Sequence, residues 1–271
     1  MSTPTLPLAW SGFSVRRFTH LCDLLAQIVG RDMKILYKRS VLGVLWSLLN
    51  PLMQLVVFVF VFQRVLEVQM PERTSYPAFT FVGILAWTWF SASLSQSASA
   101  VTGSKELIKR PGFPAAILPV ATLIMNLIHY LLALPILLVF LLSDRAPLNI
   151  TLFLLPVVIG LQFIVTLSLG YLVATANVIF RDTQHIVSVL LPLMFYLTPI
   201  FYDPARVPAQ YGKILLFNPM NHVITAYRAI FLFGKAPDWS ALAMIAAIAG
   251  VVLFLTHRFF MSVSSRFVDE L

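Results

Sequence analysis

The chain of 271 residues is 59% hydrophobic and only 11% charged, and its mean hydropathy is +0.87. Soluble globular chains carry about 25% charged residues, so this apolar surplus has no soluble core to fill and indicates an integral membrane protein. Because a spanning helix needs roughly 20 apolar residues, the chain has room for about six spans and none for a separate catalytic domain.

The net charge of +8 raises the question of a nucleic-acid partner. The lysines and arginines gather at the ends of the apolar runs, as the anchors on the cytoplasmic side of membrane proteins do. We therefore expect no nucleic-acid binding.

The first predicted element is an amphipathic helix over residues 19–38. Leucine, isoleucine and valine recur there at helical spacing, with Asp23, Arg31 and Lys34 among the polar positions between them. This pattern is typical of a helix that lies in the membrane interface rather than crossing the membrane.

Six apolar runs follow, and we interpret them as membrane spans. They are long and unbroken, whereas a membrane β-barrel would show alternating segments of roughly 10 residues. The fifth run is short for a crossing and contains Pro192 and Pro199. The predicted fold class is an all-α integral membrane protein with spans over 41–62, 77–101, 115–142, 148–180, 186–201 and 239–256.

Residues 202–238 lie between the fifth and sixth predicted spans and are semi-polar. Their apolar pieces are too short to cross a membrane, and Pro204, Pro208 and Pro219 interrupt continuous helix. We expect re-entrant or interfacial helices here.

The basic residues also predict the orientation of the chain. Lys105, Lys109 and Arg110 lie in the short connection over 102–114, against Arg145 alone in the turn on the opposite side. Short cytoplasmic loops carry the excess of lysine and arginine, so this connection and both termini are expected in the cytoplasm.

The spans contain almost no ionisable side chain, and His129 is the one clear exception. Ion-coupled carriers need such groups inside the membrane, so proton-driven transport is not expected. An isolated helix histidine is more often a packing residue. A phosphate-binding loop is not found either, because Gly103-Ser104-Lys105 has the wrong residue order.

No catalytic or metal-binding constellation is apparent in the sequence. The single cysteine, Cys22, cannot form an internal disulfide, and Asp182 with His185 or Asp203 is best interpreted as isolated loop residues. We expect no enzyme activity, no metal and no cofactor in this chain.

Uncharged polar side chains recur on single helix faces of three spans. Their amides and hydroxyls can hydrogen-bond sugar hydroxyls, and an aromatic face can slide along sugar rings, which would suit a conduit for a long carbohydrate. The alternative is that small and polar residues hold helices together. The candidate conduit residues are Trp46, Asn50 and Gln54, then Ser91 and Ser95, then Gln162 and Thr166.

Five ordered motifs carry a resemblance to a known family. They are the segments 31–43 followed by 45–47 (Leu-Trp-Ser) and 50–51 (Asn-Pro), then 109–114 (Lys-Arg-Pro-Gly-Phe-Pro), 177–182 (Asn-Val-Ile-Phe-Arg-Asp), 197–202 (Leu-Thr-Pro-Ile-Phe-Tyr) and 218–222 (Asn-Pro-Met-Asn-His). Together they make the chain similar to ABC-2 permeases for polysaccharide export, as one transmembrane domain over 1–271. Exporters of O-antigen in Gram-negative bacteria look closest, and teichoic acid and capsule exporters share the pattern.

The resemblance implies a complex of two permease copies with two copies of a separate ATPase, which binds ATP and Mg²⁺. The substrate it implies is a glycan linked to undecaprenyl pyrophosphate, moved across the bacterial inner membrane. The implied ATPase contacts are Asp32, Ser104, Lys105, Glu106, Leu107, Lys109 and Arg110.

The basic end of the amphipathic helix allows two interpretations. Its cations at the cytoplasmic membrane edge can attract the substrate's pyrophosphate or hold anionic lipid headgroups. These residues are Arg31, Lys34, Lys38 and Arg39.

Three functions are weighed against each other. The first is export of a lipid-linked polysaccharide of the O-antigen type. The second is ABC-2 export of capsule, teichoic acid or a small drug or lipid. The third is a membrane enzyme acting on polyprenyl-linked sugars.

Overall fold

The computed structural model describes residues 15–38, 40, 42–67, 74–147, 149–264 and 267, and all regular structure among them is helical. The helices are α1 (Val15–Tyr37), α2 (Trp46–Phe58), α3 (Tyr76–Ala100), α4 (Lys105–Ile108), α5 (Ile117–Ser143), α6 (Leu155–Ile179), α7 (Thr183–Leu197), α8 (Gly212–Phe217), α9 (Pro219–Phe231) and α10 (Trp239–Ser264). Short 3-10 turns precede α2, α4, α6 and α8, and π-helical turns extend α2 over Val59–Val65.

A side-chain oxygen caps the N-terminus of three of the helices. Ser75 Oγ accepts the Ala78 N–H ahead of α3, and Asn218 Oδ1 accepts the Met220 N–H ahead of α9. Pro77 and Pro219 lie in the first turns, where a missing N–H costs nothing. Asp238 caps α10, and the hydroxyl of Ser240 and two backbone N–H groups lower the pKa of its carboxyl.

Five helical segments are long and apolar enough to cross a membrane. They are Gly43–Val65, Tyr76–Ala100, Ile117–Ser143, Ile150–Ile179 and Trp239–Ser264. Four of these agree with the predicted spans to within about three residues at each end, and the last runs eight residues further, to Ser264 instead of residue 256. The fifth predicted span corresponds to α7, which is a shorter apolar helix of 15 residues and ends ahead of Pro199.

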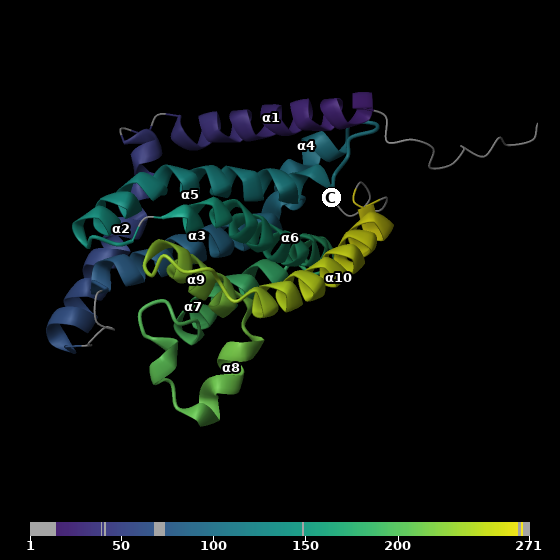
Figure 1. Ribbon diagram of the computed structural model, residues 1–271. Helices are drawn as coiled ribbons and strands as arrows, with labels where there is room; N and C mark the ends of the chain where they lie inside the picture. The colour runs from purple at the N-terminus through teal and green to yellow at the C-terminus, as the bar shows by residue number, and fades with distance from the viewer. Residues whose placement is uncertain are drawn as a thin grey trace, which may run out of the picture.

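Helix α3 lies at the centre of the bundle. It contacts α2, α5, α6, α7 and α9, and 78% of its most apolar stretch is buried, against 11% for the segment Gly43–Val65. Helix α10 packs chiefly on α6. In Figure 1, α1 extends along α5, which it contacts, so its second half follows a spanning helix rather than lying across the end of the bundle.

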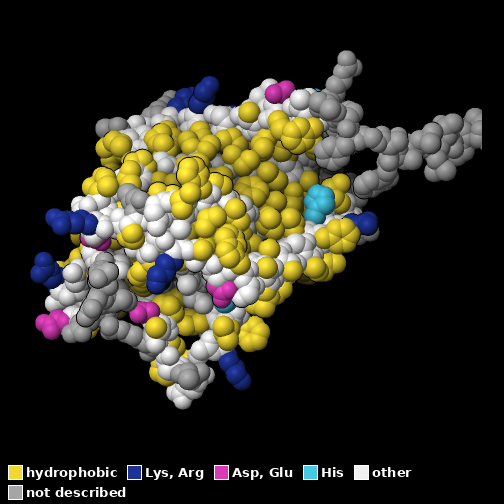
Figure 2. Space-filling model, viewed as in Figure 1, with side chains coloured by type: hydrophobic (Ala, Val, Ile, Leu, Met, Phe, Trp, Pro, Cys, Tyr) yellow, Lys and Arg dark blue, Asp and Glu magenta, His cyan; other side chains and the backbone are white. Residues whose placement is uncertain are grey.

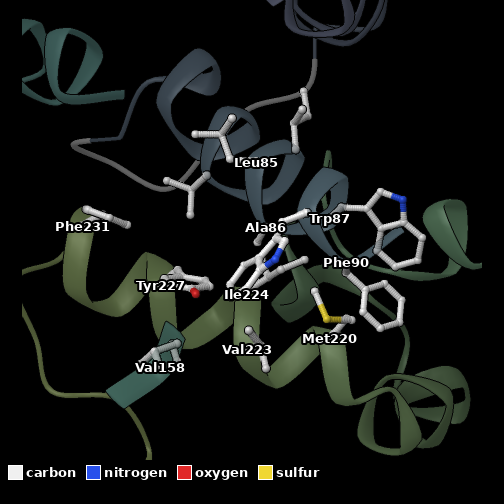
Figure 3. Packing of buried hydrophobic residues seen from close by; sticks show 14 of the residues in the cluster. Leu85, Ala86, Trp87, Phe90, Val158, Met220, Val223, Ile224, Tyr227 and Phe231 are labelled. Atoms are coloured by element: carbon white, nitrogen blue, oxygen red, sulfur yellow. The ribbon is translucent and has the colours of Figure 1, made fainter. Parts of the chain in front are cut away.

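A short helix late in the chain completes the core. Helix α9 packs against α3 and α6, and Figure 3 shows its Val223, Ile224 and Tyr227 facing Ala86 of α3 and Val158 of α6. Tyr227, Val223 and Ile224 are fully buried. The segment over 202–238, expected to contain short helices, therefore places one of them deep inside the bundle.

The outer surface is mainly apolar. Figure 2 shows hydrophobic side chains covering most of one face, with the lysines and arginines at its margins. Large side chains that are more than half exposed include Val56, Phe60, Val139 and Phe254. Contiguous apolar surface on this scale is what lipid or a partner helix covers.

Candidate functional site

A groove of about 550 Å³, which we call the α2–α7 groove, runs between α2, α3 and α7. Three of the predicted conduit residues, Gln54, Ser91 and Ser95, lie in it. Its other lining residues are Phe58, Trp87, Thr88, Ala92, Ser188, Leu191, Pro192, Phe195 and Tyr196. The groove thus combines one amide and several hydroxyls with four aromatic rings and has no charged side chain among its described lining.

Aromatic rings gather at one end of the α2–α7 groove. Phe58 stacks on Phe201 with ring centroids 5.6 Å apart and planes at 1°, and Phe62 lies 4.8 Å from the same ring. Phe195 of α7 is 5.6 Å from Phe58. The cluster joins α2, its π-helical extension, α7 and the segment after α7 into one apolar contact.

A second cavity, of about 350 Å³, holds the other two residues of the predicted α2 stripe. This α1–α5 cavity is bounded by the end of α1, the start of α2 and the middle of α3 and α5. Trp46 and Asn50 line it, whereas Gln54 faces the groove, so the stripe is divided between two spaces. Thr88 and Ala92 of α3 line both.

The last two predicted conduit residues lie inside the helix packing. Gln162 and Thr166 are fully buried, and neither lines the groove or the cavity. Gln162 Nε2 donates to the carbonyl oxygen of Ala86 at 2.8 Å, and Thr166 Oγ1 donates to the carbonyl oxygen of Gln162. Gln162 thus links α6 to α3, and the Thr166 bond stays within α6.

Arg228 of α9 is a buried cation that sequence reasoning did not single out. Its guanidinium donates to the carbonyl oxygens of Pro199 and Ile200 at 2.7 Å and to that of Phe79 at 3.3 Å. It also lies 3.4 Å from the centroid of the Phe79 ring. One side chain therefore ties α9 to the start of α3 and to the break after α7.

The predicted ATPase-contact residues come together around a polar cavity of about 550 Å³. It is lined by Arg31 of α1 and by Thr102–Leu107, Lys109 and Arg110 of the connection after α3. Asp32 lies beside it and forms an ion pair with Arg31 at 2.8 Å. The amphipathic helix and the basic connection, which are far apart in the sequence, thus form one surface, which we call the coupling surface.

The predicted headgroup residues are only partly described. Arg31 lines the coupling surface, Lys34 is exposed on α1, and Lys38 is exposed directly after it. Arg39 lies outside the described residues. These cations are therefore spread along α1 rather than converging on one point.

The remaining candidate groups form no reactive cluster. His129 Nε2 is 2.8 Å from the hydroxyl of Tyr37, and Cys22 is an exposed free thiol. Asp203 accepts the Ala205 N–H and so caps a turn. No group of three or more His, Cys, Asp and Glu side chains that could hold a metal occurs within the described part of the chain.

The family of the chain follows from comparison with known proteins. The family model for ABC-2 type transporters matches residues 23–232, which is well over half of the sequence. The chain belongs to the ABC-2 type transporter family. This ABC-2 match extends from α1 through α9 and so includes the coupling surface, the α2–α7 groove and the α1–α5 cavity.

Curated relatives of this ABC-2 protein include O-antigen export permeases and a polysialic acid transport protein. An O-antigen export system permease protein of Myxococcus xanthus is 36% identical over 259 residues, which cover 95% of this chain and 98% of the relative. One from Klebsiella pneumoniae is 33% identical over 79% of this chain and 82% of its own length. A polysialic acid transport protein of Escherichia coli is 25% identical over 92% of this chain and 94% of its own.

Several polar residues of these sites were missed in the sequence. Gln96 and Asn126 pair in the α1–α5 cavity, and Tyr37 joins them there. Asn126 and His129 are three residues apart on one helix, and that spacing in an apolar run was an available signal. Arg228 was harder to predict, because a lone arginine in a semi-polar stretch is normally interpreted as a surface residue.

Proposed function

We propose that this chain is the permease subunit of an ATP-driven exporter that moves a lipid-linked polysaccharide of the O-antigen type. The observation that carries the proposal is the similarity to the O-antigen export permease of Myxococcus xanthus along almost the full length of both chains. The uncharged polar and aromatic lining of the α2–α7 groove supports it, because such a surface hydrogen-bonds sugars without holding them by charge.

The complex that we propose contains two permease copies and two copies of a separate ATPase, which binds ATP and Mg²⁺. Support for a second copy comes from α2 and α7, which flank the groove but leave wide apolar faces uncovered. Val56, Phe60, Val189 and Leu193 are all more than half exposed there. A second copy packed on these faces would enclose the groove between two subunits.

In the membrane, α7 is proposed as the fifth of six spans, and α8 with α9 as the re-entrant region on the outer side. Helix α7 has only 15 residues, which is short for a membrane crossing. The π-helical extension of α2 lies beside α7 and adds apolar surface at the same end. Both termini and the coupling surface are then cytoplasmic, in agreement with the lysines and arginines of residues 102–114. The proposed location is the bacterial inner membrane.

The coupling surface is the proposed contact with the ATPase. It presents Arg31, Lys105, Lys109 and Arg110 around Glu106, so charge-assisted hydrogen bonds to a partner groove are available. The proposed substrate carrier is undecaprenyl pyrophosphate, whose charge the cations of α1 would attract at the membrane edge.

Gene deletion tests the proposed function directly. Loss of long surface polysaccharide, with lipid-linked glycan retained in the cytoplasm, is the expected result. Normal surface polysaccharide in a deletion strain without a second exporter would refute the assignment. Loss of a capsule instead of O-antigen would favour the second candidate, which the similarity to the polysialic acid transport protein supports.

A further inference from the structure

The α1–α5 cavity is a partly open space bordered by four helices, α1, α2, α3 and α5. Its volume of about 350 Å³ falls in the range of small-ligand sites, and it lies on the opposite side of Thr88 and Ala92 from the α2–α7 groove. Its described lining is Leu36, Tyr37, Ser40, Trp46, Ser47, Asn50, Pro51, Leu85, Thr88, Trp89, Ala92, Gln96, Asn126, His129, Tyr130 and Ala133.

The walls offer two kinds of contact at once. Tyr37, Trp46, Trp89 and Tyr130 supply aromatic rings, and Asn50, Gln96 and Asn126 supply amides. Aromatic faces cover the apolar C–H face of a sugar ring, while amides both donate to and accept from hydroxyl groups. This combination of groups fits a pyranose better than an acyl chain, because an acyl chain cannot hydrogen-bond to the amides.

Two of these polar groups have hydrogen-bonding capacity to spare. No hydrogen bond of the Asn50 amide to any described residue is found, and its side chain is exposed. Asn126 Nδ2 donates to Gln96 Oε1 at 2.9 Å and to the Thr122 carbonyl oxygen at 2.8 Å. Within the described residues, Gln96 Nε2 itself makes only a long contact of 3.5 Å, to Asn126 Oδ1. Both amides can therefore receive a ligand without breaking a good bond.

The side chains that line the cavity argue against a phosphate-bearing ligand. No Asp, Glu, Lys or Arg lines it among the described residues, and the described cations of α1 nearest to it are exposed. A phosphate or pyrophosphate would need cationic partners, and the described lining has no lysine or arginine, while Nε2 of His129 already contacts the Tyr37 hydroxyl. The ligand is thus a neutral, hydroxyl-rich group.

The end of helix α1 borders one side of the cavity, where Tyr37 makes a polar contact with α5. The Tyr37 hydroxyl lies 2.8 Å from His129 Nε2, with ring centroids 5.9 Å apart in an edge-on arrangement. The same helix carries Arg31 in the coupling surface, about two turns earlier. An occupant of the cavity therefore contacts the helix that also borders the surface proposed to meet the ATPase.

We propose that the α1–α5 cavity is a binding site for a neutral sugar unit of the exported lipid-linked glycan, separate from the α2–α7 groove. The proposal rests on the proposed function for the identity of the glycan. The sugar ring packs on Trp46 and the neighbouring aromatic rings, and its hydroxyls bond to Asn50 and Gln96. The charged carrier stays outside, toward the basic residues of α1.

The binding test uses purified full-length protein in phospholipid nanodiscs and a photoreactive dodecyl maltoside as probe. The expected result is crosslinking to peptides that line the α1–α5 cavity, with competition by free maltose but not by inorganic pyrophosphate. Asn50→Leu and Gln96→Leu should each weaken labelling about threefold to tenfold, the effect of losing one or two net hydrogen bonds. Met53→Leu, an exposed position on α2 that lines neither the cavity nor the groove, is the matched control and should leave labelling unchanged.

The export test separates the glycan from other sugar lipids. In cells that depend on this chain, Asn50→Leu should reduce surface polysaccharide in parallel with probe binding, at unchanged protein level. Probe labelling unaffected by Asn50→Leu and Gln96→Leu overturns the site. Lost labelling with normal export also overturns it, because the sugar bound would then belong to a structural glycolipid. A deletion strain that exports normally would instead refute the proposed function, while the binding result stands by itself.

Discussion

Arg228 supplies the sharpest prediction at the scale of single residues. Its replacement by Met leaves the carbonyl oxygens of Pro199 and Ile200 without their arginine donor inside a packed bundle, where an unpaired acceptor costs about 1–3 kcal/mol. The Phe79 carbonyl loses a second donor but keeps its place in helix α3. We expect Arg228→Met to lower the unfolding temperature of the detergent-purified protein by on the order of 5–10 °C, measured by tryptophan fluorescence.

A conservative change and a surface arginine serve as controls for Arg228. Arg228→Lys keeps the charge but loses the planar fork that reaches three carbonyls, so it should recover less than half of the loss. Arg258, exposed on α10 with its guanidinium 5.3 Å from the centroid of the Phe254 ring, should tolerate Met with little change. An Arg228→Met protein as stable as the Arg258→Met protein would contradict this role.

Glycine 234 is a second residue whose effect can be stated in advance. Its φ is +58°, and an added Cβ would lie 2.8 Å from the carbonyl oxygen of Pro147 and from Asn149 Nδ2. Asn149 Nδ2 also donates to the Gly234 carbonyl. An added Cβ would therefore strain the backbone at residue 234 and crowd the side chain that makes this hydrogen bond. Gly234→Ala should destabilise the protein by roughly 1–3 kcal/mol.

The matched control for Gly234 lies in α10. Gly250 has a helical backbone with open space around it, so Gly250→Ala should be neutral or slightly stabilising. The two variants are compared by thermal unfolding in the same detergent. Equal unfolding temperatures would show that the turn at residue 234 carries no strain.

How far the sequence predicts single residues depends on where a side chain points. Trp46, Asn50 and Gln54 share a helix face by spacing, and the structure keeps them on accessible surfaces, but in two different spaces. Which space each one meets depends on how α3, α5 and α7 pack around α2, and no local pattern encodes that packing. Gln162 has the same chemistry as Gln54 yet lies in the interior, because its helix is covered by α3, α9 and α10.

At the scale of elements, the four longest helices were predictable because each comes from an apolar run long enough to cross a membrane. Helix α7 was harder, since Pro199 ends it early and Leu197 is followed by a loop held by Arg228. The direction of α1 was not predictable from its amphipathic pattern, because an apolar stripe covers a neighbouring helix as well as it covers lipid. Its contact with α5 through Tyr37 depends on a partner residue 92 positions away.

The coupling surface yields the prediction at this scale. Exchanging charges with Glu106→Lys and Lys109→Glu keeps the net charge but reverses the pattern that a partner groove would read. We expect at least tenfold less co-purification of the co-expressed ATPase, since each charge-assisted hydrogen bond contributes about 1.5–3 kcal/mol. Membrane insertion should be unchanged.

A charge change at the other end of the bundle controls for general effects on the coupling assay. Lys235 is exposed between α9 and α10, on the side proposed to be periplasmic. Lys235→Glu should leave ATPase recovery intact. Equal recovery with the charge-exchanged protein would remove the coupling role from the connection after α3.

The whole molecule is one bundle whose burial is uneven. Helix α3 is enclosed, while α2 and α7 present apolar faces that no other described part of the chain covers. Lipid can cover such faces, but lipid alone leaves the α2–α7 groove open to hydrocarbon. The Gln54 amide would lack a partner there, whereas Ser91 and Ser188 donate to carbonyl oxygens of their own helices. A second copy placed over the groove keeps it aqueous, so the uneven burial favours a dimer through α2 and α7.

Cysteine crosslinking tests this arrangement, because Cys22 is the only cysteine of the chain. After Cys22→Ser, single cysteines at Val56, Val189 and Leu193 sample the uncovered faces, and Val251→Cys samples an equally exposed position on α10. Disulfides require Cα atoms within about 7 Å, so oxidation in membranes should give a crosslinked dimer for at least one position of the first set and none for Val251→Cys. The reverse pattern would place α10 at the interface, and the α2–α7 groove would then open to lipid instead of to a second subunit.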